Sequence, residues 1–333
     1  MDTNDITVGV VGLGLMGCSI TTCLLLAGHP VIAVAPVTAD LEHAEKRIHG
    51  HLEKSFEEGI ADRAPDIYLE SLVITEDYSM LKECRLVIEC TLENLDIKKS
   101  VYHKIETEIA PDALLVSNTS AIPISILQKL TKRPEHFFGL HWMEPSHTTR
   151  FLEVICGDLS DVTLGEYLYD LSHSWGKEPT LVKKDIRGFI TNRLMYAMYR
   201  EAFHLVENGY ATIEDVDRAC RNNPGYWMTL VGVFRWMDLT NVPAYHTVMK
   251  DLFPTLSNTA EVPKLIDDVV KAGGRGIANG KGFYDYTPEE AKLWEEVFTE
   301  FTYDIRALAL KYPADVVKTK LKKADAEEKE VNR

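Results

Sequence analysis

Two ionisable residues stand in apolar segments in the middle of this 333-residue chain. His141 ends one apolar run, and Glu153, twelve residues further on, lies within the next. If the two runs are neighbouring strands, the carboxylate can accept a hydrogen bond from the imidazole, fix its tautomer and stabilise its protonated form. The spacing therefore predicts a hydrogen-bonded histidine–carboxylate pair, although a lone buried histidine is more often an ordinary core residue.

A glycine-rich turn near the N-terminus predicts a dinucleotide site. It follows a β-branched run, 6–11, and precedes an apolar run, 20–26, of helical type. In such a turn the first glycine makes the tight bend, the second lets the backbone approach the pyrophosphate, and the third lets helix and strand pack closely. The residues of this candidate cofactor-binding turn are Gly12, Leu13, Gly14, Leu15, Met16 and Gly17.

The second half of the dinucleotide fingerprint is missing. An NAD site usually has Asp or Glu at the end of the second strand, where the carboxylate holds the ribose hydroxyls. Here residues 34–38 are Val-Ala-Pro-Val-Thr, and the nearest acid is Asp40. No arginine follows at once to accept a 2′-phosphate. We expect NAD as the cofactor and leave NADP open.

The elements that must position these residues alternate between strands and helices. Buried-type strands are expected at 6–11, 31–35, 86–89, 114–116, 137–141 and 152–155, and helical segments at 20–26, 42–58 and 96–110. Apolar strands that alternate with helices indicate a parallel or mostly parallel sheet covered on both faces. The first part of the chain is therefore an α/β domain.

The pattern changes to helices only near residue 186. Apolar residues recur at helical spacing from 188 to 208, Gly209 stops that helix, and Thr212 caps another over 213–222. We expect a dinucleotide-binding domain over 1–185, a helical substrate and dimerisation domain over 186–317, and a charged tail over 318–333 that is a frayed helix or disordered.

Composition excludes several classes of function. The net charge of −15 disfavours nucleic-acid and anionic membrane binding, and no apolar run approaches the length of a bilayer span. The six cysteines are scattered and form no CxxC pair, so we expect reduced thiols and no metal. The N-terminus, Met-Asp-Thr-Asn-Asp, lacks the basic residues of a signal peptide, and a cytoplasmic protein is expected.

Several short motifs, in order and at suitable spacing, resemble the L-3-hydroxyacyl-CoA dehydrogenase family over most of residues 6–286. The resemblance implies an α/β Rossmann-type N-terminal domain, an all-α C-terminal domain and, often, a homodimer. The motifs are the glycine turn, the pair Glu93-Asn94, the run Ser117-Asn118-Thr119-Ser120, Gly139-Leu140-His141, Leu152-Glu153-Val154-Ile155, Gly188-Phe189-Ile190 with Asn192-Arg193, and Gly282-Phe283-Tyr284 with Tyr286.

The resemblance also implies roles for individual residues. His141 matches the general base, Glu153 its partner, and Ser120 and Asn192 the side chains that bond to the reacting oxygen or a neighbouring carbonyl. Ser120 and Asn192 can otherwise be helix caps. The family positions near the nicotinamide ribose are matched by Glu93 and Lys98, although Lys98 can instead be a solvated helix charge.

Departures from the family pattern concern the substrate. Glu144, in Trp142-Met143-Glu144-Pro145, replaces an amide that faces the nicotinamide end, and Arg150 is a candidate partner for a substrate carboxylate. The family's CoA-contacting segment is rich in lysine, whereas residues 52–59 here are Leu-Glu-Lys-Ser-Phe-Glu-Glu-Gly. Paired carboxylates are a poor cradle for a nucleotide phosphate.

Three interpretations follow from these observations. The first is a 3-hydroxyacyl-CoA dehydrogenase of the 3-hydroxybutyryl-CoA type with altered CoA contacts. The second keeps the interconversion of a 3-hydroxyl and a 3-keto group but acts on a small, CoA-free 3-hydroxy acid or sugar acid. The third, less favoured, is a dinucleotide-binding sensor without turnover.

Overall fold

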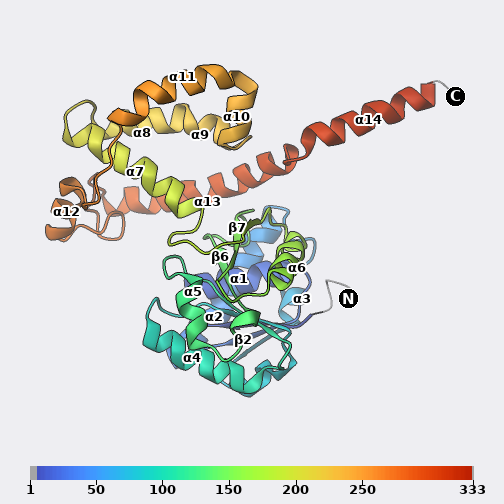
Figure 1. Cartoon of the computed structure of the whole chain (residues 1–333). Coiled ribbons are helices and arrows are strands. Elements are labelled where there is room, and N and C mark those ends of the chain that lie inside the picture. Colours follow the sequence, from blue (N-terminus) through green and yellow to red (C-terminus); the bar gives the residue numbers. More distant parts are fainter. Residues whose placement is uncertain (1–5, 332–333) are drawn as a thin grey trace. The chain divides into compact units, whose positions relative to one another are not determined.

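The structure is a computed structural model that describes the backbone of residues 6–331. The chain divides into two compact units, the first ending at Arg193 and the second beginning at Leu194 (Figure 1). Each unit has its own architecture, an α/β sandwich in the first and helices in the second.

The first unit is built on one eight-stranded sheet with the strand order β3-β2-β1-β4-β5-β6-β7-β8. Every neighbouring pair is parallel except β6 and β7, so the expected mostly parallel sheet is confirmed. The strands are β1 Val8–Val11, β2 Val31–Val34, β3 Leu72–Thr75, β4 Leu86–Glu89, β5 Leu114–Ser117, β6 Phe137–Trp142, β7 Leu152–Cys156 and β8 Thr180–Val182.

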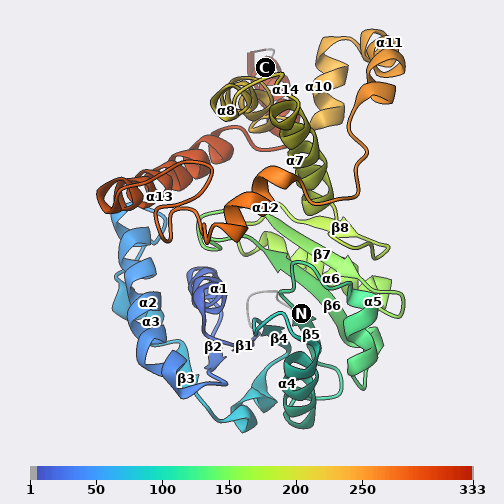
Figure 2. The same cartoon turned by 90° about the vertical axis from the view of Figure 1, so that its left-hand side faces the viewer.

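Helices cover both faces of this sheet, which is why its central strands are apolar on both sides (Figure 2). One face packs against α1 Leu15–Leu26, α2 Thr38–Glu57, α3 Pro65–Leu69 and α6 Val162–His173. The other packs against η1 Tyr78–Glu83, α4 Leu95–Glu108 and α5 Ile124–Leu127, which continues into the short turns η2 Gln128–Leu130 and η3 Pro134–His136.

Two strands lie outside the expected set. β3 and β8 are the edge strands of the sheet and are only partly buried. β8 has only three residues, whereas β3, Leu-Val-Ile-Thr, is as apolar as β4 and was not predicted although its pattern allowed it. The six expected strands are present, and their residues are buried throughout.

The second unit is helical within its described residues, apart from isolated β-bridges near Lys281. As expected, α7 ends shortly before Gly209, and the Thr212 side chain caps α8. The charged segment 318–333 lies within α14, apart from its last two residues, which fall outside the described part. The elements are α7 Thr191–Glu207, α8 Ile213–Asn222, α9 Pro224–Met228, α10 Val233–Thr240, α11 Val242–Leu252, η4 Phe253–Thr255, α12 Lys264–Lys271, α13 Pro288–Lys311 and α14 Val316–Val331.

Among residues 6–331, none of the helices combines the length and the apolar character that crossing a bilayer demands.

Candidate active site and cofactor site

The glycine turn joins the end of β1 to the start of α1. Gly12 has a φ of +101°, a conformation that favours glycine, and a side chain there would press on the Cys90 carbonyl. A side chain at Gly17 would collide with the carbonyl oxygen of Gly12, so helix and strand could not pack this closely. Gly14, by contrast, faces open space.

This turn fits a diphosphate. Gly14 is the N-cap of α1 and supplies no side-chain acceptor, and the first turn of α1 contains no acidic residue. The N–H groups at the helix start are therefore available to an anion. Leu13 is buried in the core and contributes only backbone, whereas Leu15 is exposed where the helix begins.

A buried ionic network lies at the end of β4, beside this turn. Glu89 is fully buried, and Lys98 of α4 donates from Nζ to both of its carboxylate oxygens, at 2.8 and 2.9 Å. The hydroxyls of Tyr102 and Ser117 donate to the same carboxylate at 3.0 and 2.7 Å. The charge is thus fully compensated inside the protein, as a buried carboxylate requires.

Glu93 connects this network to the loop after β5. Its Oε1 accepts hydrogen bonds from the Thr119 hydroxyl at 2.5 Å and the Ser120 amide at 2.9 Å, and Lys98 Nζ lies 3.3 Å from Oε2. Burial favours a higher pKa for Glu93, but the Thr119 hydroxyl and the Lys98 charge outweigh it and lower the pKa. Lys98 is 1% exposed and Glu93 38%, so Glu93 is the more accessible of the two predicted cofactor contacts.

His141 and Glu153 lie side by side on β6 and β7. The antiparallel register pairs them directly, and His141 Nδ1 is 2.8 Å from Glu153 Oε2. The rings of Phe151 and Phe189 pack against the imidazole, with centroids 5.4 and 5.6 Å away. The imidazole is therefore held in one orientation, and Nε2 is the nitrogen left for a substrate.

The start of α7 holds the other oxygen of Glu153. Oε1 accepts from the amides of Ile190 and Thr191, at 3.0 and 2.9 Å, and from the Thr191 hydroxyl at 3.2 Å. Burial favours a higher pKa for Glu153, but the bonds from His141 and Thr191 outweigh it and lower the pKa. Phe189, at a φ of +51°, makes the turn that aims these amides at the carboxylate.

Ser120 and Asn192 also come together. The Asn192 side-chain amide donates to the backbone carbonyl of Ser120 at 2.9 Å, while the Ser120 amide is held by Glu93. Asn192 directly follows Thr191, which binds Glu153. Hydrogen bonds and the intervening backbone therefore connect the histidine pair to Glu93.

The two predicted substrate contacts lie in the segment between β6 and β7. Burial raises the pKa of Glu144, against hydrogen bonds from the Ser19 side chain and the Ser146 amide. Arg150 forms an ion pair with Glu178, with 3.1 Å between Nη2 and Oε1. A substrate carboxylate would have to compete with Glu178 for this guanidinium.

Sequence reasoning did not single out two residues of this site. Glu89 anchors Lys98, and the signal for it was a lone carboxylate at the end of the apolar run 86–88. Asn118 lies at the end of β5 and accepts from the Trp142 amide at 3.0 Å, which ties the β5 and β6 ends together. In the sequence it is recognisable only as part of the run 117–120.

The fold and the site define a dehydrogenase of the Rossmann class, with a glycine turn that fits a diphosphate and a histidine–carboxylate pair, both at the carboxyl ends of the parallel strands. The family model for the 3-hydroxyacyl-CoA dehydrogenase NAD-binding domain matches residues 7–186, and that for the C-terminal domain matches residues 188–286. The chain belongs to the 3-hydroxyacyl-CoA dehydrogenase family. The expected NAD-dependent oxidoreductase acting on a CH–OH group is thereby confirmed.

Individual relatives fall into two groups by substrate. A 5-formyl-3-hydroxy-2-methylpyridine 4-carboxylate 5-dehydrogenase of Mesorhizobium japonicum is 32% identical over 86% of this chain and 92% of its own length. The crystal structure of an enzyme with that activity, described as an NAD⁺-dependent dismutase, matches with a TM-score of 0.85 at 31% identity, over 92% of this chain and 98% of the other. The (S)-3-hydroxybutyryl-CoA dehydrogenase of Ralstonia eutropha matches with a TM-score of 0.70 at 28% identity, over 84% and 99%.

Proposed function

We propose that His141 is the general base of the reaction and that Glu153 positions it. The observation that carries this proposal is the 2.8 Å contact between His141 Nδ1 and Glu153 Oε2. An ionised Glu153 keeps the imidazole proton on Nδ1, so the lone pair of Nε2 takes the hydroxyl proton as the carbonyl forms. NAD, when bound, supplies the hydride acceptor.

We propose that Ser120 and Asn192 hold the substrate near this base. The support is the hydrogen bond from the Asn192 side-chain amide to the Ser120 backbone carbonyl and the direct chain link from Asn192 to Thr191, which binds Glu153. An amide and a hydroxyl are suitable donors for a hydroxyl that becomes a carbonyl, because neither carries a charge that changes along the reaction.

We propose that the substrate is a small hydroxy acid or its carbonyl counterpart without CoA. The support is the end of α2, the segment that corresponds to the family's lysine-rich CoA contact. There Lys54 pairs with Glu58 at 2.7 Å and with Glu57 at 3.5 Å, so its charge is already compensated and a carboxylate is in excess. The Mesorhizobium relative is named for a pyridine carboxylate substrate, and that name includes no CoA.

Glu144 and Arg150 belong to the same proposal as substrate contacts. Arg150 would exchange Glu178 for a substrate carboxylate, and Glu144, whose pKa is raised by burial, would contact a substrate hydroxyl. The second candidate substrate is a 3-hydroxyacyl-CoA, which the likeness to the Ralstonia enzyme favours.

The test is NADH oxidation by the purified protein with acetoacetyl-CoA and, separately, with a panel of small keto acids and aromatic formyl or keto carboxylates. We expect turnover with a CoA-free acid that is lost in His141→Asn and kept in His246→Asn, an exposed histidine of α11. Rapid turnover of acetoacetyl-CoA alone would reject the CoA-free substrate. Unchanged rates in His141→Asn would reject the assignment of the base.

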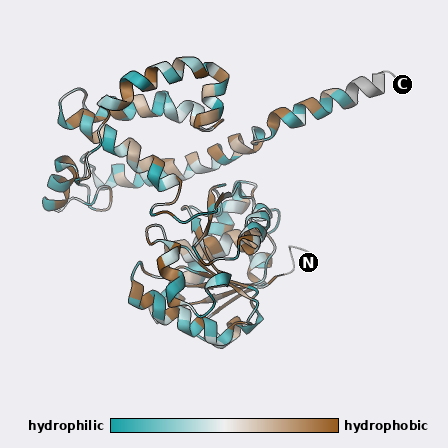
Figure 3. Cartoon of the chain, in the orientation of Figure 1, coloured by the Kyte–Doolittle hydropathy of each residue, from teal (hydrophilic) through white to brown (hydrophobic). Residues whose placement is uncertain are grey.

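We also propose that the enzyme is a cytoplasmic homodimer. All six cysteines are free thiols, as in a reducing compartment. None of the helices from α7 to α12 has a buried residue, although apolar positions recur along them (Figure 3). Phe234 and Tyr226 are 78% and 76% exposed, and apolar surface of this kind usually marks an association face.

Light scattering after size exclusion tests this state. We expect about twice the chain mass of 37.6 kDa, and a monomer for Phe234→Glu if α10 lies in the contact. A wild-type protein with the mass of a single chain would contradict the dimer.

A further inference from the structure

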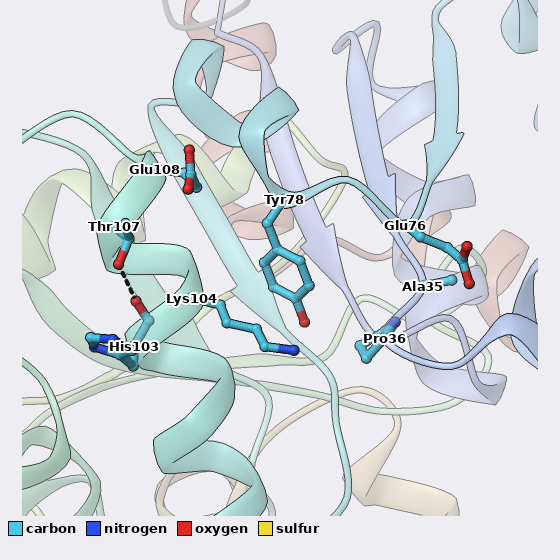
Figure 4. Close-up of a pocket in the computed structure, with 8 residues that line it drawn as sticks. All are labelled: Ala35, Pro36, Glu76, Tyr78, His103, Lys104, Thr107 and Glu108. Carbon is cyan, nitrogen blue, oxygen red and sulfur yellow. Dashed lines mark hydrogen bonds between the residues drawn. The ribbon is translucent and has the colours of Figure 1, made fainter.

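A cavity of about 400 Å³ opens at the end of β2, where the usual ribose carboxylate is missing. Ala35 and Pro36, the residues that directly follow β2, form one part of its wall (Figure 4). Residues of α4, among them His103 and Lys104, form another. The adenosine half of a dinucleotide binds at this place in a Rossmann-type sheet.

β3 brings a carboxylate to this cavity. The parallel register pairs Val34 with Thr75, and the Ala35 amide donates to the Thr75 carbonyl at 2.8 Å. Glu76, the next residue, therefore leaves the sheet beside Ala35, which occupies the position of the missing acid. It lines the cavity, whereas Asp40, the nearest acid in sequence, does not.

A hydrogen bond from the start of α2 holds Glu76 in place. The Thr38 hydroxyl, in the first turn of α2, donates to Glu76 Oε1 at 2.7 Å. This bond fixes the carboxylate at the β2–α2 turn and leaves Oε2 without a hydrogen bond from the residues whose side chains the structure describes. A carboxylate oriented by one oxygen can accept from a ribose hydroxyl through the other.

The remaining wall supplies an aromatic surface and a single lysine. The Tyr78 hydroxyl is buried and has no hydrogen-bond partner among the described residues, and Lys104 lies over its ring at 5.2 Å from the centroid. Glu108 adds a second carboxylate to the wall. A carboxylate beside the ribose disfavours a phosphate dianion at that place, which usually requires an arginine or several lysines.

We propose that Glu76 replaces the absent β2 carboxylate: it accepts hydrogen bonds from the adenosine ribose hydroxyls of NAD and excludes the 2′-phosphate of NADP. The carboxylate has moved from the second strand to its neighbour, and Thr38 orients it. The inference concerns cofactor choice and does not depend on which substrate the enzyme uses.

The experiment measures binding of NADH, NADPH and an NADH analogue without the adenosine 2′-hydroxyl, through nicotinamide fluorescence. For the wild type we expect NADH to bind at least about 100-fold more tightly than NADPH and about tenfold more tightly than the 2′-deoxy analogue. In Glu76→Gln, NADH binding should weaken about tenfold or more, the preference over NADPH should fall below about tenfold, and NADH and the analogue should bind alike.

Glu108→Gln is the matched control, because it removes a carboxylate of the same wall. We expect it to keep the wild-type preference, and Thr38→Val to give an intermediate loss. Thermal unfolding of Glu76→Gln should match the wild type, since Glu76 is exposed. A wild type that binds NADPH or the 2′-deoxy analogue as tightly as NADH would overturn the proposal, as would an equal change of preference in Glu108→Gln.

Discussion

Substitution of Glu153 by glutamine changes only one oxygen of the carboxylate to an amino group. Glu153 is fully buried and accepts hydrogen bonds on both sides, from His141 Nδ1 at Oε2 and from the Ile190 and Thr191 amides at Oε1. Glutamine has a single acceptor oxygen. The NH₂ group of the glutamine must therefore face either His141 Nδ1 or the two α7 amides, and it cannot accept a hydrogen bond from them.

The two orientations of the glutamine have different costs. With its oxygen toward the α7 amides, its NH₂ group donates to His141 Nδ1, and the proton then sits on Nε2, where the base must be free. The opposite orientation keeps the useful tautomer but leaves the amides of Ile190 and Thr191 without an acceptor. Each unsatisfied buried group costs about 1–3 kcal/mol.

The expected loss of activity follows from that cost. The orientation that keeps Nε2 free leaves two amides unsatisfied, which costs about 2–6 kcal/mol. About 1.4 kcal/mol corresponds to a factor of ten in rate. We expect the kcat of Glu153→Gln to fall by a factor of between about 30 and about 10⁴. KM and the affinity for NADH should change little, because the buried Glu153 contacts neither the substrate nor the cofactor directly.

The assay is steady-state kinetics with the best substrate, with NADH affinity measured by fluorescence. Glu166→Gln is the control, since Glu166 is an exposed glutamate that pairs with Lys183 in the same unit. A folded Glu153→Gln protein with kcat within about threefold of the wild type would refute the tautomer argument.

Further perturbations test other parts of the site. Gly14→Ala should leave the melting temperature unchanged but weaken NADH binding, whereas Gly17→Ala should lower the melting temperature of the cofactor-free protein, because only the second side chain meets the backbone. In urea titrations Lys98→Met should lower the free energy of unfolding by about 3–5 kcal/mol, and adding Glu89→Gln should recover part of it; a double variant no more stable than the single one would contradict a buried pair. The lowered pKa of Glu153 stabilises the fold at pH values above the ordinary value of 4.5, and this contribution is lost as pH falls through the lowered value. The stability difference between wild type and Glu153→Gln should therefore shrink below about pH 4.5, and a constant difference between pH 3 and 7 would count against it.

The central fold could be predicted because its strands are buried on both faces and are therefore apolar without interruption. The edge strands were not predicted, because β8, Thr180–Val182, has only three residues and β3 is a short apolar run beside charged residues. Glu76 was missed for a different reason. Its importance depends on β3 lying beside β2, which no local pattern reveals.

The candidate site could also be predicted in part. His141 and Glu153 were expected on neighbouring strands, and they lie opposite each other in an antiparallel pair whose direction the sequence did not indicate. The burial of Lys98 was not foreseen, since a lysine on a charged helix is usually solvated. It is buried because Glu89 and Glu93 compensate its charge, and these contacts cross between β4 and α4.

The antiparallel pairing of β6 with β7 has an evolutionary consequence. The positions of His141 and Glu153 are set by strand register, which the residues on either side of them fix. The connecting segment 143–151, which contains Glu144 and Arg150, lies outside both strands, so side chains at its partly exposed positions can change without shifting that register. A lineage of such enzymes could therefore exchange one substrate for another by altering a single hairpin connection while it inherits the proton-transfer pair unchanged.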